Sequence, residues 1–391
     1  MGRKFSEKFA QWEQEARLRE TVVVDHGNAP IIEQNQRQYL NVSSGNYLGM
    51  ARHSQVIDTV QKALRQYGLS SGGSPLVCGY STEQEIFARR LAEFLGTESA
   101  LVVAAGYLAG LAVVPALMSE GDTIYSDSLN HASLIDACRL SKAHVAIYSH
   151  GDVDSLEESL RRDTSGHRMI VTDGVFSMDG DVALLPRLMQ LAEEYDAWLL
   201  ADDSHALGVL GEKGGGSVEH FDLHSSRLIF ASSLSKGLGI HGGVIAASNE
   251  VIQYLKNTAR SWIFASALPA AWCAGGTTSL DILENSWAKR QQLWRHSLRF
   301  RTRLQQMGYR TIPTTVPEIP IIPWIIGSEN DTLRVAEHLK QRSIWSLAIR
   351  PPTVPINSSR IRFALSAEHS DQQIDYVLDM IGRANFSAPT D

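Results

Sequence analysis

The sequence predicts an α/β fold, with a mainly parallel seven-stranded sheet in a large domain and a smaller α+β domain at the C-terminal end. Between about residues 100 and 247, short apolar runs alternate with helical segments, a pattern typical of a sheet covered by helices on both faces. Beyond residue 310 strands and helices are mixed, which indicates a second unit. We expect an N-terminal helix and short β segment over 1–40, the large domain over 41–285 and the small domain over 286–391.

The N-terminal part is predicted to hold three helices and one short β segment. Within residues 1–20, apolar side chains three to four positions apart predict one apolar helix face, formed by Phe5, Phe9, Trp12 and Ala16. A β segment ends at Arg37–Asn41, and polar, glycine-rich loops follow at 43–49 and 70–74. The spacing of apolar residues predicts helices over 54–67 and 83–96, the second ending at a glycine.

Seven apolar runs have the length and setting of buried strands. They are residues 100–104, 122–126, 144–148, 168–173, 197–202, 227–232 and 243–247. Leu101–Met118 carries no charge, but Gly106, Gly110 and Pro115 interrupt it, so it predicts a buried strand, a turn and a helix rather than a membrane span.

The C-terminal part is predicted to start from one long helix over about 270–306 that links the two domains. After it we expect strands over 319–326 and 361–365, and helices over 331–342 and 371–383.

Charge and cysteine content exclude several classes of protein. The 43 acidic residues outnumber the 36 basic ones, so nothing indicates a nucleic-acid partner. Three scattered cysteines argue against a disulfide framework and favour a reducing, cytoplasmic location. The first residues lack the apolar core of a signal peptide.

Two of the predicted strands end in residues that suit one cofactor. Asp202 and His205 follow the run 197–201, and Ser233, Ser235 and Lys236 follow the run 227–231. In open α/β sheets ligands bind at the carboxyl ends of the strands. A desolvated Lys forms a Schiff base with an aldehyde, hydroxyls beside glycines suit a phosphate, and an Asp suits a pyridinium nitrogen. This set indicates pyridoxal 5'-phosphate.

Other readings of these residues remain open at this stage. Gly237–Gly242 fits the G-x-G-x-x-G pattern of dinucleotide-binding proteins, but no acidic residue stands about twenty positions further on. A metal-dependent hydrolase could use Asp202, Asp203 and His205, which would leave Lys236 without a role. A non-catalytic, cofactor-binding regulator is a third possibility, although no DNA-binding segment is visible.

Six motifs in order give the chain a resemblance to a known family. They are Ser71–Ser74, Leu129–Leu134, Val175–Gly180, Asp202–His205, Ser235–Lys236 and Arg350–Pro355. From about residue 37 to 385 the chain resembles the α-oxoamine synthases, pyridoxal phosphate enzymes of the fold-type I, aminotransferase-like class. The resemblance implies decarboxylative condensation of a small amino acid with an acyl-CoA or acyl-carrier thioester. It is closest to the branch that makes 8-amino-7-oxononanoate from L-alanine and a pimeloyl thioester in biotin synthesis; the alternatives are glycine with acetyl-CoA, or another acyl-CoA.

The resemblance also implies a role for each site residue. Lys236, Asp202, His205 and His131 would be catalytic: Lys236 would hold the cofactor as a Schiff base, Asp202 would bind its pyridine nitrogen, His205 would bind its phenolic oxygen, and His131 would stack on the ring. The remaining cofactor contacts would be Gly106, Tyr107, Ser177, Ser233, Ser235 and Ser266, the last reaching the neighbouring subunit of a homodimer. The substrates would contact Arg19, His131, Thr353 and Arg362. Asp173 departs from the Glu usual in the oxononanoate branch.

Overall fold

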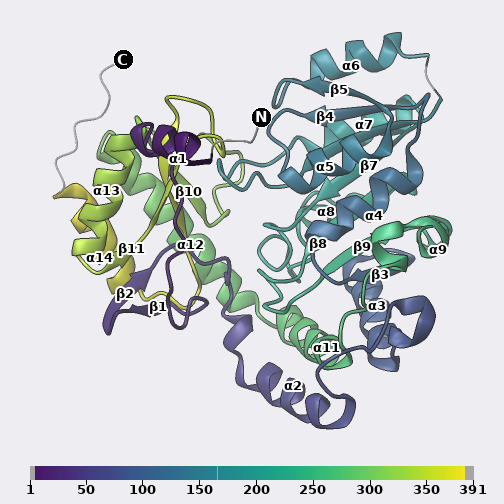
Figure 1. Cartoon of the computed structure of the whole chain (residues 1–391), viewed down its shortest axis with the longest axis horizontal. Coiled ribbons are helices and arrows are strands. Elements are labelled where there is room, and N and C mark those ends of the chain that lie inside the picture. The colour runs from purple at the N-terminus through teal and green to yellow at the C-terminus, as the bar shows by residue number, and fades with distance from the viewer. Residues whose placement is uncertain (1–4, 165, 384–391) are drawn as a thin grey trace. The chain divides into compact units, whose positions relative to one another are not determined.

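The computed structural model describes residues 5–164 and 166–383, and the chain divides into two compact units (Figure 1). The large unit comprises residues 48–177 and 182–290, and the small unit comprises 1–47, 178–181 and 291–391. The sequence predicts domain limits after residues 40 and 285, and these limits remain a prediction. The compact units divide after Tyr47 and Arg290.

The large unit is built on a seven-stranded sheet with the strand order β3-β9-β8-β7-β6-β4-β5. Neighbouring strands pair in parallel from β8 through β7, β6 and β4 to β5, whereas β9 pairs antiparallel with both β8 and β3. The strands are β3 (Ser99–Val103), β4 (Thr123–Asp127), β5 (His144–Tyr148), β6 (Arg168–Asp173), β7 (Ala197–Asp202), β8 (Leu228–Ser233) and β9 (Gly243–Ala247). The predicted mainly parallel, seven-stranded sheet is confirmed, and no predicted strand end is more than one residue from its observed position.

Helices cover the sheet because alternate strand residues point to opposite faces. One apolar cluster joins β3, β4, β6, β7, β8 and β9 to α4 and α5, which contact each other (Figure 1), and to α9. The helix α7 packs on β6 and β7. The α-helices of this unit are α2 (Ser54–Tyr67), α3 (Thr82–Leu95), α4 (Tyr107–Leu117), α5 (Ala132–Ser141), α6 (Val153–Arg162), α7 (Leu185–Glu194), α8 (Ser217–His220), α9 (Asn249–Thr258), α10 (Arg260–Ile263) and α11 (Ala270–Glu284), with short helical turns η1 (Met50–Arg52) and η2 (Pro75–Gly79).

The predicted long helix over 270–306 is wrong. The structure has two helices, α11 and α12 (Trp287–Gln306), separated at Asn285 and Ser286. The Asn285 Nδ2 and Ser286 Oγ atoms donate to carbonyl groups one turn back, at 2.9 and 2.7 Å. Short polar side chains of this kind compete with the main-chain hydrogen bonds of a helix, which explains why the helix stops here.

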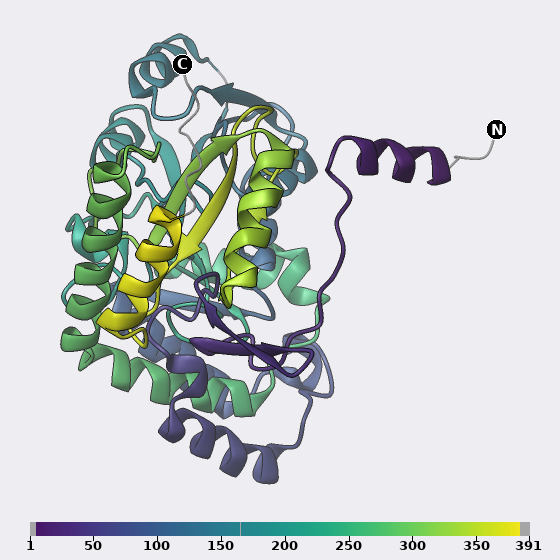
Figure 2. The same cartoon turned by 90° about the vertical axis from the view of Figure 1, so that its left-hand side faces the viewer.

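The small unit contains two three-stranded sheets with helices around them. One sheet has the order β1-β2-β11 and the other β10-β13-β12. Figure 2 shows the second sheet between α12, α13 and α14. The strands are β1 (Ile31–Gln34), β2 (Arg37–Asn41), β10 (Ile321–Gly327), β11 (Ile344–Trp345), β12 (Leu347–Ile349) and β13 (Ser359–Ala364); the helices are α1 (Phe5–Gln14), α12, α13 (Glu329–Gln341) and α14 (Asp371–Gly382).

The N-terminal helix is shorter than predicted. It ends at Gln14, and Ala16 lies in the left-handed region at φ 52°, so Ala16 does not extend the expected apolar stripe. No residue of α1 is buried, and Phe5 and Phe9 are exposed. The first four residues of the predicted helix lie outside the described residues. Nowhere in 5–164 or 166–383 is there a helix with the length and apolarity needed to cross a bilayer.

Candidate active site

The site lies where three neighbouring strands of the large unit end. Asp173 is the last residue of β6, Asp202 the last of β7 and Ser233 the last of β8. Asp173 pairs in register with Asp202, which pairs with Ala231. Because these strands run parallel, their carboxyl ends bring polar residues together at one edge of the sheet.

A pocket at this edge collects most of the residues singled out in the sequence. Eight predicted site residues line it together: Gly106, Tyr107, His131, Ser177, Asp202, His205, Ser233 and Lys236. Asp173, Ser133, Val175 and Ser204 complete the wall. All twelve belong to the large unit. Residues from five separate stretches of the chain thus converge on one pocket.

Ser204 connects the ends of β7 and β8. Its main-chain N–H and hydroxyl both donate to Asp202 Oδ1, at 3.0 and 2.5 Å, and its hydroxyl oxygen accepts the N–H of Ser233 at 2.7 Å. These bonds fix the Asp202 carboxylate at the pocket wall. The neighbouring Asp203 is fully buried and instead accepts the N–H of Ser217 at 2.7 Å. Its burial raises its pKa to about 7.

One end of the pocket suits an anion. The helix α4 begins at Tyr107 with Gly106 as its N-cap, and the first turn of a helix presents N–H groups without intrahelical acceptors. Close by, the hydroxyls of Ser233 and Ser235 lie 2.9 Å apart. A Cβ atom on Gly106 would lie only 2.5 Å from the Cβ of Ser233, so this close approach requires glycine.

His131 caps the N-terminus of α5 and borders the pocket beside Tyr107. The two rings meet edge to face, with centroids 6.1 Å apart. His131 Nδ1 accepts the N–H of Ser133 at 3.2 Å, which leaves Nε2 as the protonated nitrogen of a neutral ring. Burial lowers the pKa of His131. The charge of Asp202 opposes this shift, and the charge of Lys236 adds to it. The ring is therefore neutral near pH 7.

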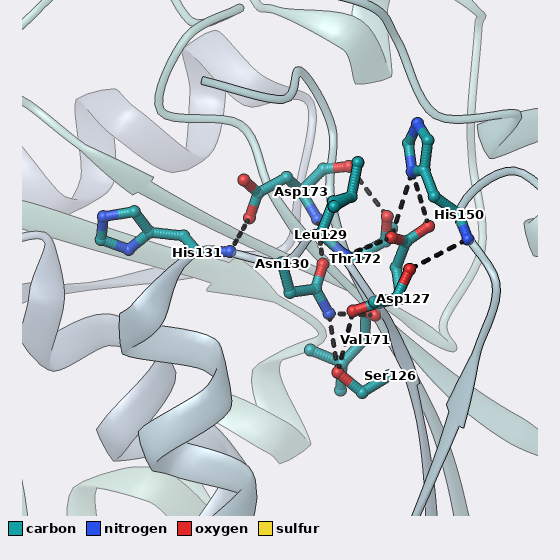
Figure 3. A network of polar contacts seen from close by, with 10 residues as sticks. Ser126, Asp127, Leu129, Asn130, His131, His150, Val171, Thr172 and Asp173 are labelled. Carbon is teal, nitrogen blue, oxygen red and sulfur yellow. Dashed lines mark hydrogen bonds and ion pairs between the residues drawn. The ribbon is translucent and has the colours of Figure 1, made fainter. Parts of the chain in front are cut away.

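A network of polar contacts holds the loop that carries His131 (Figure 3). The N–H of His131 donates to Asp173 Oδ1 at 3.1 Å, and Asn130 Oδ1 accepts the N–H of Asp173 at 2.9 Å. Further back, both carboxylate oxygens of Asp127 lie 3.1 Å from His150 Nδ1. The loop between β4 and α5 is thus tied to β6.

The remaining predicted site residues lie elsewhere. Ser266 is exposed in the loop after α10 and is absent from the pocket wall, as is Ser235. In the small unit, Arg19 donates to the Thr353 hydroxyl at 2.7 Å. Arg362, on β13, hydrogen-bonds the hydroxyl of the fully buried Tyr47. These contacts orient two guanidinium groups that were predicted to bind substrate.

Sequence reasoning missed three polar residues of the pocket as site residues: Asp173, Ser133 and Ser204. Each had a usable signal. Asp173 ends a predicted strand next to the one that Asp202 ends, and Ser204 lies inside the Asp202–His205 motif. Ser133 lies two residues after His131, in the first turn of a helix. A polar residue at the end of a strand, or in the loop or helix start that follows it, is a site candidate when a neighbouring strand already ends in a predicted site residue.

The structure also gives evidence on two of the alternatives, the dinucleotide-binding protein and the metal-dependent hydrolase. Gly237–Gly242 leads into the strand β9 rather than opening a helix, so it does not have the setting of a dinucleotide fingerprint. Among residues 5–164 and 166–383, no three metal-binding side chains are grouped as a metal site would require, and the Asp203 carboxyl binds Ser217.

Comparison with known proteins decides the family. The sequence pattern described as "Aminotransferase class I and II" matches residues 37–381. The chain belongs to this family. The structure is similar to serine palmitoyltransferase of Sphingomonas wittichii, with a TM-score of 0.91 and 29% identity, covering 97% of this chain and 96% of the other. It is also similar to 8-amino-7-oxononanoate synthase of Francisella tularensis, with a TM-score of 0.78 and 25% identity, covering 88% and 97%.

Several curated relatives of this aminotransferase-family chain are named 8-amino-7-oxononanoate synthase. The "8-amino-7-oxononanoate synthase" of Thermoanaerobacter pseudethanolicus is 38% identical over 374 residues, covering 95% of this chain and 94% of the relative. The "8-amino-7-oxononanoate synthase 2" of Bacillus subtilis is 44% identical over 337 residues, covering 86% and 85%. Similar solved structures include a serine palmitoyltransferase described with a pyridoxal phosphate internal aldimine, at 26% identity and a TM-score of 0.92, covering 97% of each chain.

Proposed function

We propose that the chain is a pyridoxal phosphate-dependent C-acyltransferase of the α-oxoamine synthase group, and that it condenses L-alanine with a pimeloyl thioester to give 8-amino-7-oxononanoate, carbon dioxide and a free thiol. The observation that carries the proposal is the meeting of Lys236, Asp202, His205 and His131 in one pocket. Relatives named for this reaction cover more than nine tenths of the chain.

The donors in the pocket fit pyridoxal phosphate. The amine of Lys236 suits its aldehyde, the half-buried carboxylate of Asp202 suits its ring nitrogen, and the α4 N-terminus with the Ser233 hydroxyl suits its phosphate. When bound, the cofactor supplies an electron sink that stabilises negative charge at the amino acid Cα. The protein therefore needs to bind, orient and move protons rather than perform the difficult step itself.

Four of the pocket residues have a defined task in this mechanism. Lys236 Nζ would hold the cofactor aldehyde, and as a free amine it would take the proton from the substrate Cα. Asp202 keeps a proton on the pyridine nitrogen by placing a negative charge beside it. His205 would bind the phenolic oxygen, and the neutral ring of His131 would stack on the cofactor ring.

Substrate recognition is assigned to the small unit. We propose that the planar guanidinium of Arg362, oriented by Tyr47, binds the carboxylate of the amino acid in a two-point contact. Arg19 and Thr353, which hydrogen-bond each other, would contact the acyl substrate. A pimeloyl chain ends in a carboxylate, which a cationic residue recognises and which an acetyl or palmitoyl chain lacks.

The active form is proposed to be a cytoplasmic homodimer in which Ser266 reaches the neighbouring subunit's cofactor phosphate. Three large apolar side chains near Ser266 support a protein interface, because Phe264, Leu76 and Val77 are exposed by 70%, 62% and 79%. Their loops are joined, since the N–H of Ala267 donates to Gly73 O at 3.0 Å. Three free cysteines agree with a reducing compartment.

The substrate proposal is tested by incubating the holoenzyme with mixed amino acids and a panel of acyl thioesters, and identifying the product by mass spectrometry. We expect 8-amino-7-oxononanoate from L-alanine and a pimeloyl thioester, together with growth of a biotin auxotroph that expresses the chain. Exclusive turnover of glycine with acetyl-CoA, or of a long-chain acyl-CoA, would contradict the proposed substrates and leave the cofactor assignment intact.

A further inference from the structure

Asp173 is a pocket residue that the mechanism above does not use. Its side chain is 4% exposed and lines the pocket at the end of β6. It lies in register with Asp202 on the neighbouring parallel strand, so the two main chains are at the spacing of adjacent strands. A buried and a half-buried carboxyl group therefore lie side by side at one wall, which is unfavourable if both are ionised.

Asp173 also determines the position of the His131 main chain. Its Oδ1 accepts the N–H of His131 at 3.1 Å (Figure 3). Asn130 clamps the same loop to β6, because its Nδ2 donates to Val171 O at 2.8 Å and its Oδ1 accepts the N–H of Asp173 at 2.9 Å. The carboxyl group of Asp173 is thus held between the His131 loop and the β7 strand end.

The charged groups around Asp173 come from four elements. Asp202 faces it from β7, Asp127 from β4, Lys236 from the loop after β8, and His131 from the β4–α5 loop. Hydrogen-bond donors compensate the other two carboxylates: Asp202 accepts two bonds from Ser204, and Asp127 accepts the N–H of Leu129 at 2.8 Å and contacts His150. Asp173 has one such donor in the His131 N–H, so its carboxyl group receives the least hydrogen-bond compensation of the three.

Together these effects favour the neutral form of the Asp173 carboxyl group. Burial and the negative charge of Asp202 raise the pKa of Asp173 well above its usual value, while the His131 N–H and Lys236 oppose the rise. The geometry gives the same answer, because a second full charge beside Asp202 would lie on a side chain that is only 4% exposed.

We propose that Asp173 is a positioning residue that acts as a neutral hydrogen-bonding acid: one oxygen accepts the His131 N–H and holds that residue at the pocket wall, the O–H donates within the pocket, and Asp202 alone faces the cofactor ring with a negative charge. The proposal rests on the proposed cofactor site and assigns a new role within it. A neutral carboxylic acid has one donor and one acceptor on the same planar group, which the amide of Asn reproduces and the methyl group of Ala does not.

The test compares Asp173→Asn and Asp173→Ala with Asp202→Asn in the full chain loaded with pyridoxal phosphate. The main readout is the pH midpoint at which the absorbance of the bound cofactor changes. We expect Asp173→Asn to leave this midpoint within a few tenths of a unit of the wild-type value, since one neutral group replaces another. Asp202→Asn should shift it by about one unit or more, because the carboxylate that pairs with the ring nitrogen is removed.

The second readout is kcat/KM for the amino acid. Asp173→Ala should lose about tenfold or more, because the buried His131 N–H then has no acceptor, and Asp173→Asn should lose about threefold at most. A midpoint in Asp173→Asn that shifts as far as in Asp202→Asn would show that Asp173 is ionised and would overturn the proposal. Equal losses of kcat/KM in the Asn and Ala variants would overturn the positioning role.

The wild-type protein separates this test from the proposed function. If it takes up no pyridoxal phosphate, the proposed function fails. Normal cofactor binding in the wild type combined with either contradicting result rejects the role of Asp173 alone. Thermal melting of each variant is measured first, and the Asn variant keeps the test decisive if the Ala variant does not fold.

Discussion

Arg362 illustrates how a single side chain is prepared for a substrate. It extends from β13 and is oriented by the hydroxyl of Tyr47, a residue with no exposed surface. Burial raises the pKa of Tyr47, while the Arg362 cation opposes that rise, so the hydroxyl stays protonated and neutral near pH 7. A guanidinium held in this way presents its flat donor edge without first losing side-chain freedom.

The first prediction concerns this group. Replacing Arg362 by Lys keeps the charge but removes the two-point geometry, so KM for L-alanine should rise about tenfold or more with a smaller change in kcat. Steady-state kinetics with varied alanine at saturating acyl thioester measures this. Tyr47→Phe is the matched variant and should show a milder rise. An unchanged KM in Arg362→Lys would place the carboxylate site elsewhere.

At the residue scale, the sequence allowed side chains with distinctive chemistry to be grouped into one candidate site. Lys236, Asp202 and His205 follow apolar runs of strand length, and a parallel sheet brings such ends together. Asp173 was harder to assign, because one carboxylate at a strand end is equally consistent with a cap or a surface residue. Its contact with His131 spans 42 positions of the chain and cannot be read from local sequence.

At the scale of elements, the N-terminus of α4 packs closely against the end of β8. Gly106 allows them to approach, and a Cβ atom there would lie 2.7 Å from the Cα of Ser233 as well as 2.5 Å from its Cβ. The backbone of β8 would have to move to relieve this overlap. The proposed phosphate contacts depend on both elements and would be disturbed together.

The second prediction follows from this close approach. Gly106→Ala should weaken pyridoxal phosphate binding by about tenfold or more, because the loss of well-placed charged hydrogen bonds costs more than 1 kcal/mol. The dissociation constant is measured by titrating apo-protein and following the cofactor absorbance. Gly110→Ala lies in the same helix, and its Cβ would meet Leu134 Cδ2 at 3.1 Å, a contact that a side chain can relax. Equal loss in both variants would contradict the special role of Gly106.

Element boundaries were predictable where apolar periodicity is strong. The β strands of the large unit are apolar runs bounded by polar residues, and each was located to within one residue. The break between α11 and α12 was missed because only two short polar residues, Asn285 and Ser286, produce it. The strands β11 and β12 were missed because two and three residues carry no periodic signal, and their pairing partners are distant in sequence.

At the scale of the whole chain, stability should depend on pH through a buried histidine of the small unit. His369 is 1% exposed; its Nδ1 accepts the N–H of Ser366 at 3.1 Å and its Nε2 donates to Asn41 O at 3.0 Å. This arrangement requires the neutral ring. Burial therefore lowers the pKa of His369 to about 4, although the Asn41 carbonyl opposes the shift.

The third prediction is that the folded state weakens on acidification. In the unfolded chain the histidine binds its proton near pH 6.5, whereas in the folded chain it does so only near pH 4. The unfolded state thus binds more protons between these values, and the free energy of unfolding falls as the pH is lowered through them, by about 3 kcal/mol from this residue. Urea denaturation of the wild type and of His369→Asn at several pH values measures this; parallel pH slopes in the two proteins would refute it.

The central claim is that this pocket holds pyridoxal phosphate through Lys236. The most direct measurement is borohydride reduction of the purified holoenzyme, followed by proteolysis and mass spectrometry, with Lys236→Ala as the paired variant. We predict a coloured protein whose reduced cofactor remains attached to the peptide containing Lys236, and a variant with no such attachment and only a trace of activity. A colourless protein that takes up no cofactor, or a cofactor fixed to a different lysine, would contradict the account.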